Sequence, residues 1–216
     1  MPGAPVPPEV TDAASFQAAS GATDAQMGDL ERFRALLSDW NEKMNLVGPS
    51  AMDAFWPRHA WDSAQLLKIE FAAKVWADLG AGAGFPGLVL AILLKDTPGA
   101  EVHLVESMAK RCRFLEAVVG TLNLPAKVHN ARAESLSLNV EVVTARACAP
   151  MVKLLGFARP YLRGGAVGLF LKGQDVASEL TEATKCWKFD ADLIQSLSGS
   201  EGQIVRVKGL SRVRPV

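Results

Sequence analysis

The chain has 216 residues, of which 49% are apolar, and its 23 Lys and Arg residues balance 23 Asp and Glu residues. This length and apolar fraction suit one folded domain with a full core and exclude a wholly disordered chain. The most apolar run, residues 88–94, is far shorter than the ~20 residues of a membrane-spanning helix. The N-terminus lacks the features of a secretory signal. Three widely spaced cysteines favour a reducing cytosol over a disulfide framework or a zinc cluster.

The charges are unevenly distributed along the chain. The first 30 residues contain four acidic residues and no basic one, which leaves 23 basic and 19 acidic residues in positions 31–216. Residues 1–22 are also rich in Ala, Pro, Ser and Gly, and this composition predicts a disordered or loosely attached extension. Basic residues cluster at positions 110–113, 143–176 and from 203 onward. Such clusters are compatible with a polyanionic partner, although surface Lys and Arg commonly serve solubility.

The next segment is predicted to form a small helical cap over residues 23–70. Apolar residues recur at three-and-four spacing over residues 24–46, the pattern of an amphipathic helix. A second helical piece is predicted at about residues 51–55, and a third runs from Trp56-Pro57 to about residue 67.

From residue 74 onward, short apolar runs alternate with helical patterns. Strands are predicted over residues 75–79, 101–105, 126–129, 140–146 and 166–171, and from 203 into the tail. Helices are predicted over residues 87–95, 109–122, 152–162 and 179–187. Strands that alternate with helices indicate an α/β fold with a mostly parallel, doubly wound sheet. Residues 71–216 therefore form the predicted main domain, one unit with the cap.

A glycine-rich turn, Asp78 to Gly87, follows the first of these strands and precedes a helix. Glycines allow the backbone to approach a ligand, and they leave the N–H groups of a helix start free to bind it. A dinucleotide-binding turn needs glycine where Phe85 stands. Because the chain has no Gly-Lys-Ser or Gly-Lys-Thr sequence, a P-loop NTPase is excluded.

Two carboxylates accompany the turn. Glu106 ends the next strand, where it can accept both hydrogen bonds of a ribose diol, although a solvated helix cap is an alternative role. Asp78 faces the turn, where it can hold an amino group or order the loop. S-adenosylmethionine satisfies these features best, with Gly80, Gly82 and Gly84 lining the turn.

Seven short motifs occur in a recognisable order. They are Trp40-Asn41 with Asn45-Leu46; Arg58-His59 with Asp62-Ser63; Asp78 to Gly87; Glu106-Ser107 with Lys110-Arg111 and Phe114-Leu115; Arg132-Ala133-Glu134; Ala145-Arg146-Ala147; and Leu171-Lys172-Gly173. Together they resemble the bacterial 16S ribosomal RNA guanine-N7 methyltransferases, also called the glucose-inhibited division protein B family. The resemblance implies a Rossmann-like class I methyltransferase fold. It also implies methyl transfer from S-adenosylmethionine to N7 of a guanine in the 530 stem-loop of 16S ribosomal RNA.

The resemblance also implies site residues. It places cofactor contacts at Gly80, Phe85, Ala133-Glu134 and Arg146, with the Ala133-Glu134 pair at the adenine end. Gly82, Gly84, Asp78 and Glu106 join them on general methyltransferase grounds. The acidic, Pro-rich head and the less distinctive tail depart from the family pattern, so the RNA contacts are less well defined than the cofactor site.

The chemistry expected of such an enzyme needs no general base, because N7 of guanine carries a lone pair and no proton. Rate should come from alignment of the reacting groups and from electrostatics, and the one candidate for a catalytic role is Arg146. Arg146 is expected to bind guanine O6 or a flanking phosphate, since a cation would repel a sulfonium. His103 and His129 are expected to be packing or surface residues. His59 is expected to be either structural or a substrate contact.

The target guanine must be splayed out, since N7 in duplex RNA lies in a deep, narrow groove. Candidates for contacts with the RNA are Arg58, His59, Lys110, Arg111, Arg163 and Lys172. The expected partner is 16S ribosomal RNA within the small subunit or an assembly intermediate. The protein is expected to be a cytoplasmic monomer that requires neither a metal nor a membrane.

Three other functions fit parts of the sequence. A methyltransferase of another RNA, a protein or a small molecule would use the same turn, but the basic stretches argue against a small neutral substrate. A non-catalytic ribosome-assembly factor would not need the intact glycines and Glu106. A nucleotide-dependent oxidoreductase is disfavoured by Phe85.

Overall fold

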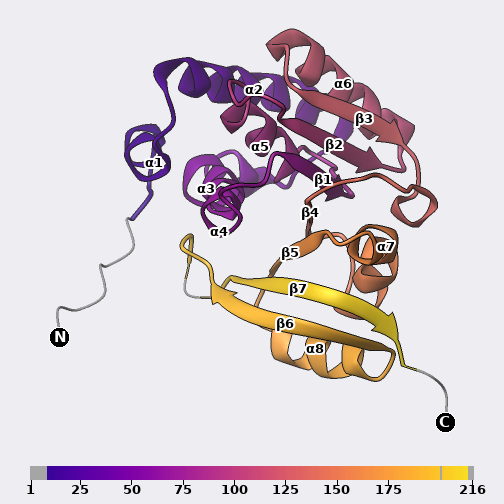
Figure 1. Cartoon of the computed structure of the whole chain (residues 1–216). Coiled ribbons are helices and arrows are strands. Elements are labelled where there is room, and N and C mark those ends of the chain that lie inside the picture. The colour runs from indigo at the N-terminus through magenta and orange to yellow at the C-terminus, as the bar shows by residue number, and fades with distance from the viewer. Residues whose placement is uncertain (1–8, 200, 214–216) are drawn as a thin grey trace, which may run out of the picture.

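A seven-stranded sheet with helices on both faces organises the chain in the computed structural model, which describes residues 9–199 and 201–213 (Figure 1). The strands are β1 Val75–Leu79, β2 Glu101–Glu106, β3 Ala126–Asn130, β4 Val142–Arg146, β5 Val167–Lys172, β6 Trp187–Gln195 and β7 Gln203–Arg212. Their order is β3-β2-β1-β4-β5-β7-β6. Strands β1 to β5 are parallel, while β7 is antiparallel to both β5 and β6. The predicted mostly parallel α/β fold is confirmed.

The helices divide between the two faces of the sheet. The α-helices are α1 Ala13–Ser20, α2 Asp24–Met44, α3 Trp61–Ala64, α4 Leu66–Ile69, α5 Gly87–Leu93, α6 Ala109–Leu122, α7 Met151–Arg163 and α8 Val176–Thr184. Two 3₁₀ turns, η1 Pro49–Ala51 and η3 Ala133–Ser135, and one π-helix, η2 Phe55–Ala60, complete the set. Helices α1 to α6 share one core with the sheet, and α7 and α8 cover the opposite face (Figure 1). No helix in the described part of the chain is long and apolar enough to cross a membrane.

Side-chain alternation along the strands separates these two cores. In β5, Leu169 and Leu171 belong to the core beneath the N-terminal helices, whereas Phe170 belongs to the core beneath α7. Successive strand residues point to opposite faces, so a strand covered on both sides is apolar throughout. The cap and the sheet are therefore packed as one body.

The strand order reverses between β1 and β4, which lie side by side although they are distant in sequence. The parallel strands end at one edge of the sheet, and ligands of such folds bind at this edge, near the reversal. The predicted site residues Asp78, Glu106, Arg146 and Lys172 all lie in the last two positions of β1, β2, β4 and β5.

The N-terminal segment differs from the expectation of a disordered extension. Asp12 caps helix α1 by accepting a hydrogen bond from the Ser15 backbone N–H at 2.8 Å. Phe16 is fully buried, with its ring 5.3 Å from that of Trp56 and 6.3 Å from that of Trp61. The prediction is therefore wrong for this helix, because composition does not register a capping box or an aromatic docking surface. Residues 1–8 lie outside the described part of the chain.

The C-terminal region contains a strand that the sequence does not reveal. A helix was expected over residues 179–187, but α8 ends at Thr184 and the buried Trp187 begins β6. Strand β6 lies at the edge of the sheet and most of its side chains are exposed. It therefore lacks the apolar alternation by which a half-buried strand is recognised. The helix expected over residues 56–67 is also divided, into η2, α3 and the start of α4.

Candidate functional site

The glycine-rich turn after β1 leaves one side of its backbone open. Gly80, Gly82 and Gly84 all have positive φ values, which only glycine adopts readily. A side chain at Gly84 would place its Cβ 2.2 Å from Leu88 Cδ1, so the packing of α5 requires this glycine. At Gly82 the nearest atom to a Cβ would be the Gly80 carbonyl oxygen, at 3.5 Å. The open space beside Gly82 is thus available to a ligand.

Glu106 ties this turn to the end of β2. Its carboxylate accepts hydrogen bonds from the backbone N–H groups of Gly82 at 3.1 Å and Met108 at 2.8 Å. Arg111, in the first turns of α6, brings a guanidinium nitrogen within 3.7 Å of the same carboxylate. Glu106 is 4% exposed. Its charge is therefore held at the turn by fixed donors.

Asp78 lies beneath the turn and is completely buried. Its Oδ2 accepts a hydrogen bond from the Gly87 backbone N–H at 2.8 Å, at the start of α5. Its Oδ1 is buried and has no hydrogen-bond partner within the described chain. Burial raises the pKa of Asp78 to about 7, and the Gly87 N–H and Arg146 only partly oppose this shift. A buried, unpaired acceptor fits a cationic donor such as an amino group.

The short turn η3 lies beside these carboxylates. The Ala131 backbone N–H donates to the Glu106 carbonyl at 3.1 Å, which joins the segment after β3 to the end of β2. The Tyr161 hydroxyl donates to the Ala133 carbonyl at 3.0 Å from α7. Burial raises the pKa of Tyr161 to about 12, so the hydroxyl keeps its proton. The segment with the predicted contacts Ala133 and Glu134 is therefore joined to the end of β2 and to α7.

Arg146, the last residue of β4, is held from several sides. Its Nη1 lies 2.6 Å from His59 Nδ1 and 3.9 Å from Asp62 Oδ2. Its guanidinium carbon lies 4.9 Å from the centre of the Phe85 ring, an arrangement that favours a cation–π interaction. Burial lowers the pKa of Arg146, while Asp62 and Asp78 act in the opposite direction. Arg146 therefore stands where the glycine turn meets the N-terminal helices.

His59 is presented by the π-helix η2, a rare conformation that often occurs at functional sites. Burial lowers the pKa of His59 to about 4, and the charges of Arg146 and Arg58 act in the same direction. The imidazole is therefore neutral at pH 7. Because a guanidinium can only donate, Nδ1 of His59 accepts its hydrogen bond from Arg146.

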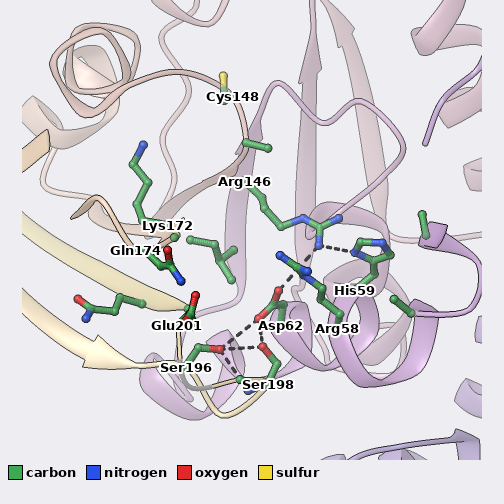
Figure 2. A pocket seen from close by; sticks show the side chains of 18 of the residues that line it. Arg58, His59, Asp62, Arg146, Cys148, Lys172, Gln174, Ser196, Ser198 and Glu201 are labelled. Carbon is green, nitrogen blue, oxygen red and sulfur yellow. Dashed lines mark hydrogen bonds and ion pairs between the residues drawn. The ribbon is translucent and has the colours of Figure 1, made fainter. Parts of the chain in front are cut away.

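A pocket of about 1190 Å³ opens beside Arg146, between η2, the ends of β4 and β5, and the turn between β6 and β7. Its polar and charged lining includes Arg58, His59, Asp62, Arg146, Lys172, Gln174, Glu179, Ser196, Ser198, Glu201 and Gln203. Figure 2 shows Arg58, Asp62 and Arg146 gathered on one side, and Lys172 and Gln174 on another. Lys172 Nζ lies 2.5 Å from Glu179 Oε2, whereas the exposed Arg58 makes no ion pair with any described residue. The pocket thus offers one cation without a protein counter-charge.

The structure brings most of the predicted residues together. Asp78, Gly80, Gly82, Gly84 and Phe85 belong to the turn, Glu106 is hydrogen-bonded to it, and Ala133 and Glu134 form η3 after β3. Arg58, His59 and Lys172 line the pocket with Arg146. Lys110 and Arg111 begin α6, close to Glu106.

One predicted RNA contact, Arg163, lies away from the pocket, as do the two histidines that were expected to be packing or surface residues. Arg163 ends α7, next to the start of β5, and so stands at the opposite edge of the sheet. His103 and His129 contact each other at 3.0 Å between β2 and β3.

Sequence reasoning missed the contribution of the β6–β7 turn. Ser196 and Ser198 line the pocket and hydrogen-bond to the Asp62 carboxylate. The sequence predicts a turn at residues 198–202 before the last strand, and the described residues there do connect β6 to β7. Nothing in the sequence indicates that Ser196 and Ser198 contact Asp62.

Comparisons with known proteins find relatives of this chain and structures that share its fold. A family model described as rRNA small subunit methyltransferase G matches residues 26–209. The protein of that name from Caulobacter vibrioides is 66% identical over 208 residues, covering 96% of each chain. The one from Bradyrhizobium sp. (strain BTAi1) is 49% identical over 187 residues, covering 85% of this chain and 84% of its own. The SAH-bound structure of a Podospora anserina methyltransferase has a TM-score of 0.58 at 13% identity, covering 90% of this chain and 92% of its own.

Proposed function

Because the chain belongs to the rRNA small subunit methyltransferase G family, we propose that it transfers a methyl group from S-adenosylmethionine to N7 of one guanine in 16S ribosomal RNA. The proposed guanine is in the 530 stem-loop of the small subunit, which is what the resemblance to the 16S ribosomal RNA guanine-N7 methyltransferases implies. One observation carries this proposal. The open glycine turn with its two carboxylates adjoins a pocket large enough for a nucleotide, and Arg146 stands between them.

The residues at the turn fit S-adenosylmethionine. The free Oδ1 of Asp78 suits the amino group of the cofactor, and the open side of Gly82 admits its backbone approach. Glu106 suits the ribose hydroxyls, and the η3 segment suits the adenine end. When bound, the cofactor supplies a methyl group on a positively charged sulfur.

The side chains around Arg146 suit a transfer that needs no base. The methyl carbon leaves sulfur and bonds to N7 of guanine, and no proton has to be removed. His59 is accordingly neutral and engaged with Arg146, so it is not needed as a proton acceptor. Arg146 binds guanine O6 or an adjacent phosphate, while the Phe85 ring supports its guanidinium. Alignment of the two reactants then provides most of the acceleration.

The pocket suits a nucleotide taken out of a helix. Its volume, about 1190 Å³, exceeds the ~300–1,000 Å³ of typical small-molecule sites. The unpaired charge of Arg58 suits a phosphate, and Lys110 and Arg111 extend the basic surface along α6. We therefore expect the substrate to be RNA with an accessible, unstacked guanine, within the small subunit or an assembly intermediate.

Tritiated S-adenosylmethionine tests this function directly. The protein is incubated with free 16S ribosomal RNA, and in parallel with small subunits from a strain that lacks the enzyme. The RNA is then digested to nucleosides. Label should be recovered in 7-methylguanosine from at least one of the two substrates. Absence of label from both, or label in another nucleoside, would contradict the proposal.

A further inference from the structure

We propose that Asp62 is a positioning residue through which the turn between β6 and β7 sets the orientation of Arg146. This inference rests on the proposed function and deepens it, because it assigns a role in methyl transfer to a part of the chain outside the cofactor motifs. It starts from the arrangement in Figure 2, where Ser196, Ser198 and Arg146 all lie next to the Asp62 carboxylate.

The two oxygens of Asp62 serve different partners. Oδ1 accepts hydrogen bonds from the hydroxyl groups of Ser198 and Ser196, the latter at 3.1 Å, and from Gln65 Nε2 at 3.2 Å. Oδ2 faces Arg146 Nη1 at 3.9 Å. The Asp62 side chain is only 14% exposed and that of Arg146 19%. In such a poorly solvated position, the attraction between the two charges is stronger than at the protein surface. The serine hydroxyls therefore fix the carboxylate that faces the guanidinium.

The turn itself is fastened to the N-terminal helices by separate bonds. Gln65 Oε1 accepts from the Leu197 backbone N–H at 2.8 Å, and Gln65 Nε2 donates to Ser196 Oγ at 2.9 Å. Trp61 Nε1 donates to the Leu197 carbonyl at 3.2 Å. The Gln65 and Trp61 side chains are both almost fully buried. The turn is thus a fixed support for Asp62.

Asp62 differs from the other two contacts of Arg146 because its side chain is charged. The Phe85 ring supports one face of the guanidinium, and His59 Nδ1 accepts from Nη1 at 2.6 Å. These contacts are neutral, so Asp62 is the carboxylate paired with Arg146 among the described residues. Misplacing a group that binds the reacting base by ~1 Å can lower a rate about 100-fold. Asp62 therefore keeps Arg146 directed at the base.

The first test uses the variant Asp62→Asn, which keeps the shape of the side chain and removes its charge. We expect kcat for subunit methylation to fall about 10-fold to 100-fold, while the Kd for S-adenosylmethionine changes less than about twofold. Ser198→Ala removes one support of the carboxylate and should lower kcat less. Asp192→Asn is the matched control, because it removes a carboxylate from β6 that pairs with Arg206 at 3.5 Å and lies outside the pocket. This control should leave kcat unchanged.

A double-mutant cycle with Arg146→Ala shows whether Asp62 acts through the arginine. In the Arg146→Ala background, measured under single-turnover conditions, Asp62→Asn and Ser198→Ala should cause no further loss. An equal loss in both backgrounds, unchanged kcat in the single variants, or an equal loss of cofactor affinity would overturn the inference. If thermal melting shows that Asp62→Asn is unfolded, the Ser198→Ala cycle decides. A wild-type protein that does not label 7-methylguanosine would overturn the proposed function and this inference together.

Discussion

The two halves of the site are built differently. Around the glycine turn, carboxylates accept hydrogen bonds from backbone N–H groups that are near in sequence, 9 residues away for Asp78 and 24 for Glu106. Around Arg146, side chains contact side chains, 87 residues apart for His59 and 134 to 136 for Asp62 with the two serines. The cofactor half therefore depends mainly on the neighbouring strands β1 and β2, whereas the pocket half joins the N-terminal helices to the turn between β6 and β7. Substitutions in the cofactor half should then change mainly the Kd for S-adenosylmethionine, and substitutions in the pocket half should change mainly kcat.

Arg146→Ala should show the largest separation. Loss of the guanidinium that holds the reacting base in position should lower kcat for subunit methylation about 10²-fold. Affinity for S-adenosylmethionine, measured by isothermal titration, should fall much less. Arg159→Ala, which removes an exposed arginine from α7, should change neither quantity. Equal losses of affinity and kcat would contradict a role for Arg146 in binding the base rather than the cofactor.

Glu106→Gln should show the reverse separation. A carboxylate bound to two backbone N–H groups and facing the ribose should contribute ~1.5–3 kcal/mol to cofactor affinity, or about 10-fold to 100-fold in Kd. At saturating cofactor, kcat should recover most of the wild-type value. Glu101→Gln, at the other end of β2, is the control and should leave the Kd unchanged. If kcat stayed low at saturating cofactor, Glu106 would also act in methyl transfer, and the division of the site into a cofactor half and a pocket half would be wrong.

Gly87→Ala should test how tightly the start of α5 packs against β2 and Asp78, and the measured quantity is the free energy of unfolding. Its Cβ would lie 2.3 Å from Leu104 Cδ2 and 2.7 Å from Asp78 Oδ2, so α5 or Asp78 has to move. We expect the free energy of unfolding in urea to fall by ~1–3 kcal/mol. Gly120→Ala, where nothing lies within 4 Å of the new Cβ in α6, should instead stabilise the protein by up to ~1 kcal/mol.

The pH dependence of cofactor binding should be the smallest effect. Burial raises the pKa of Asp78 to about 7, so the side chain is protonated and neutral below that pH and charged above it. A cationic ligand prefers the charged form, and its Kd should tighten by up to about tenfold as pH rises from 5.5 to 7. Asp78→Asn should remove this dependence. His59, whose pKa is about 4, should not contribute in this range, and His59→Asn should leave the slope unchanged.

The same contrast explains what the sequence could predict. Strand β1 and the glycine turn are contiguous in sequence and have recognisable apolar and glycine patterns, and Glu106 ends the strand that follows. The sequence therefore predicts where all three lie, and the structure confirms their positions. Strand β6 is an exposed edge strand whose residues carry no periodic signal, so the sequence predicts a turn at residues 198–202 but not that a strand precedes it or that it contacts Asp62. The predicted RNA contact Arg163 failed to reach the pocket because sequence clustering does not reveal which end of α7 meets the site.

The measurement that tests the account most directly replaces the reacting atom. Small subunits are reconstituted with 16S ribosomal RNA transcribed with 7-deazaguanosine, in which a C–H group stands in place of N7, or with ordinary guanosine. With tritiated S-adenosylmethionine, the ordinary subunits should be labelled, and the substituted ones should receive no label while still competing for the enzyme. Equal labelling of the two would show that the methyl group goes to another atom, and would contradict a base-free transfer to N7 directed by Arg146.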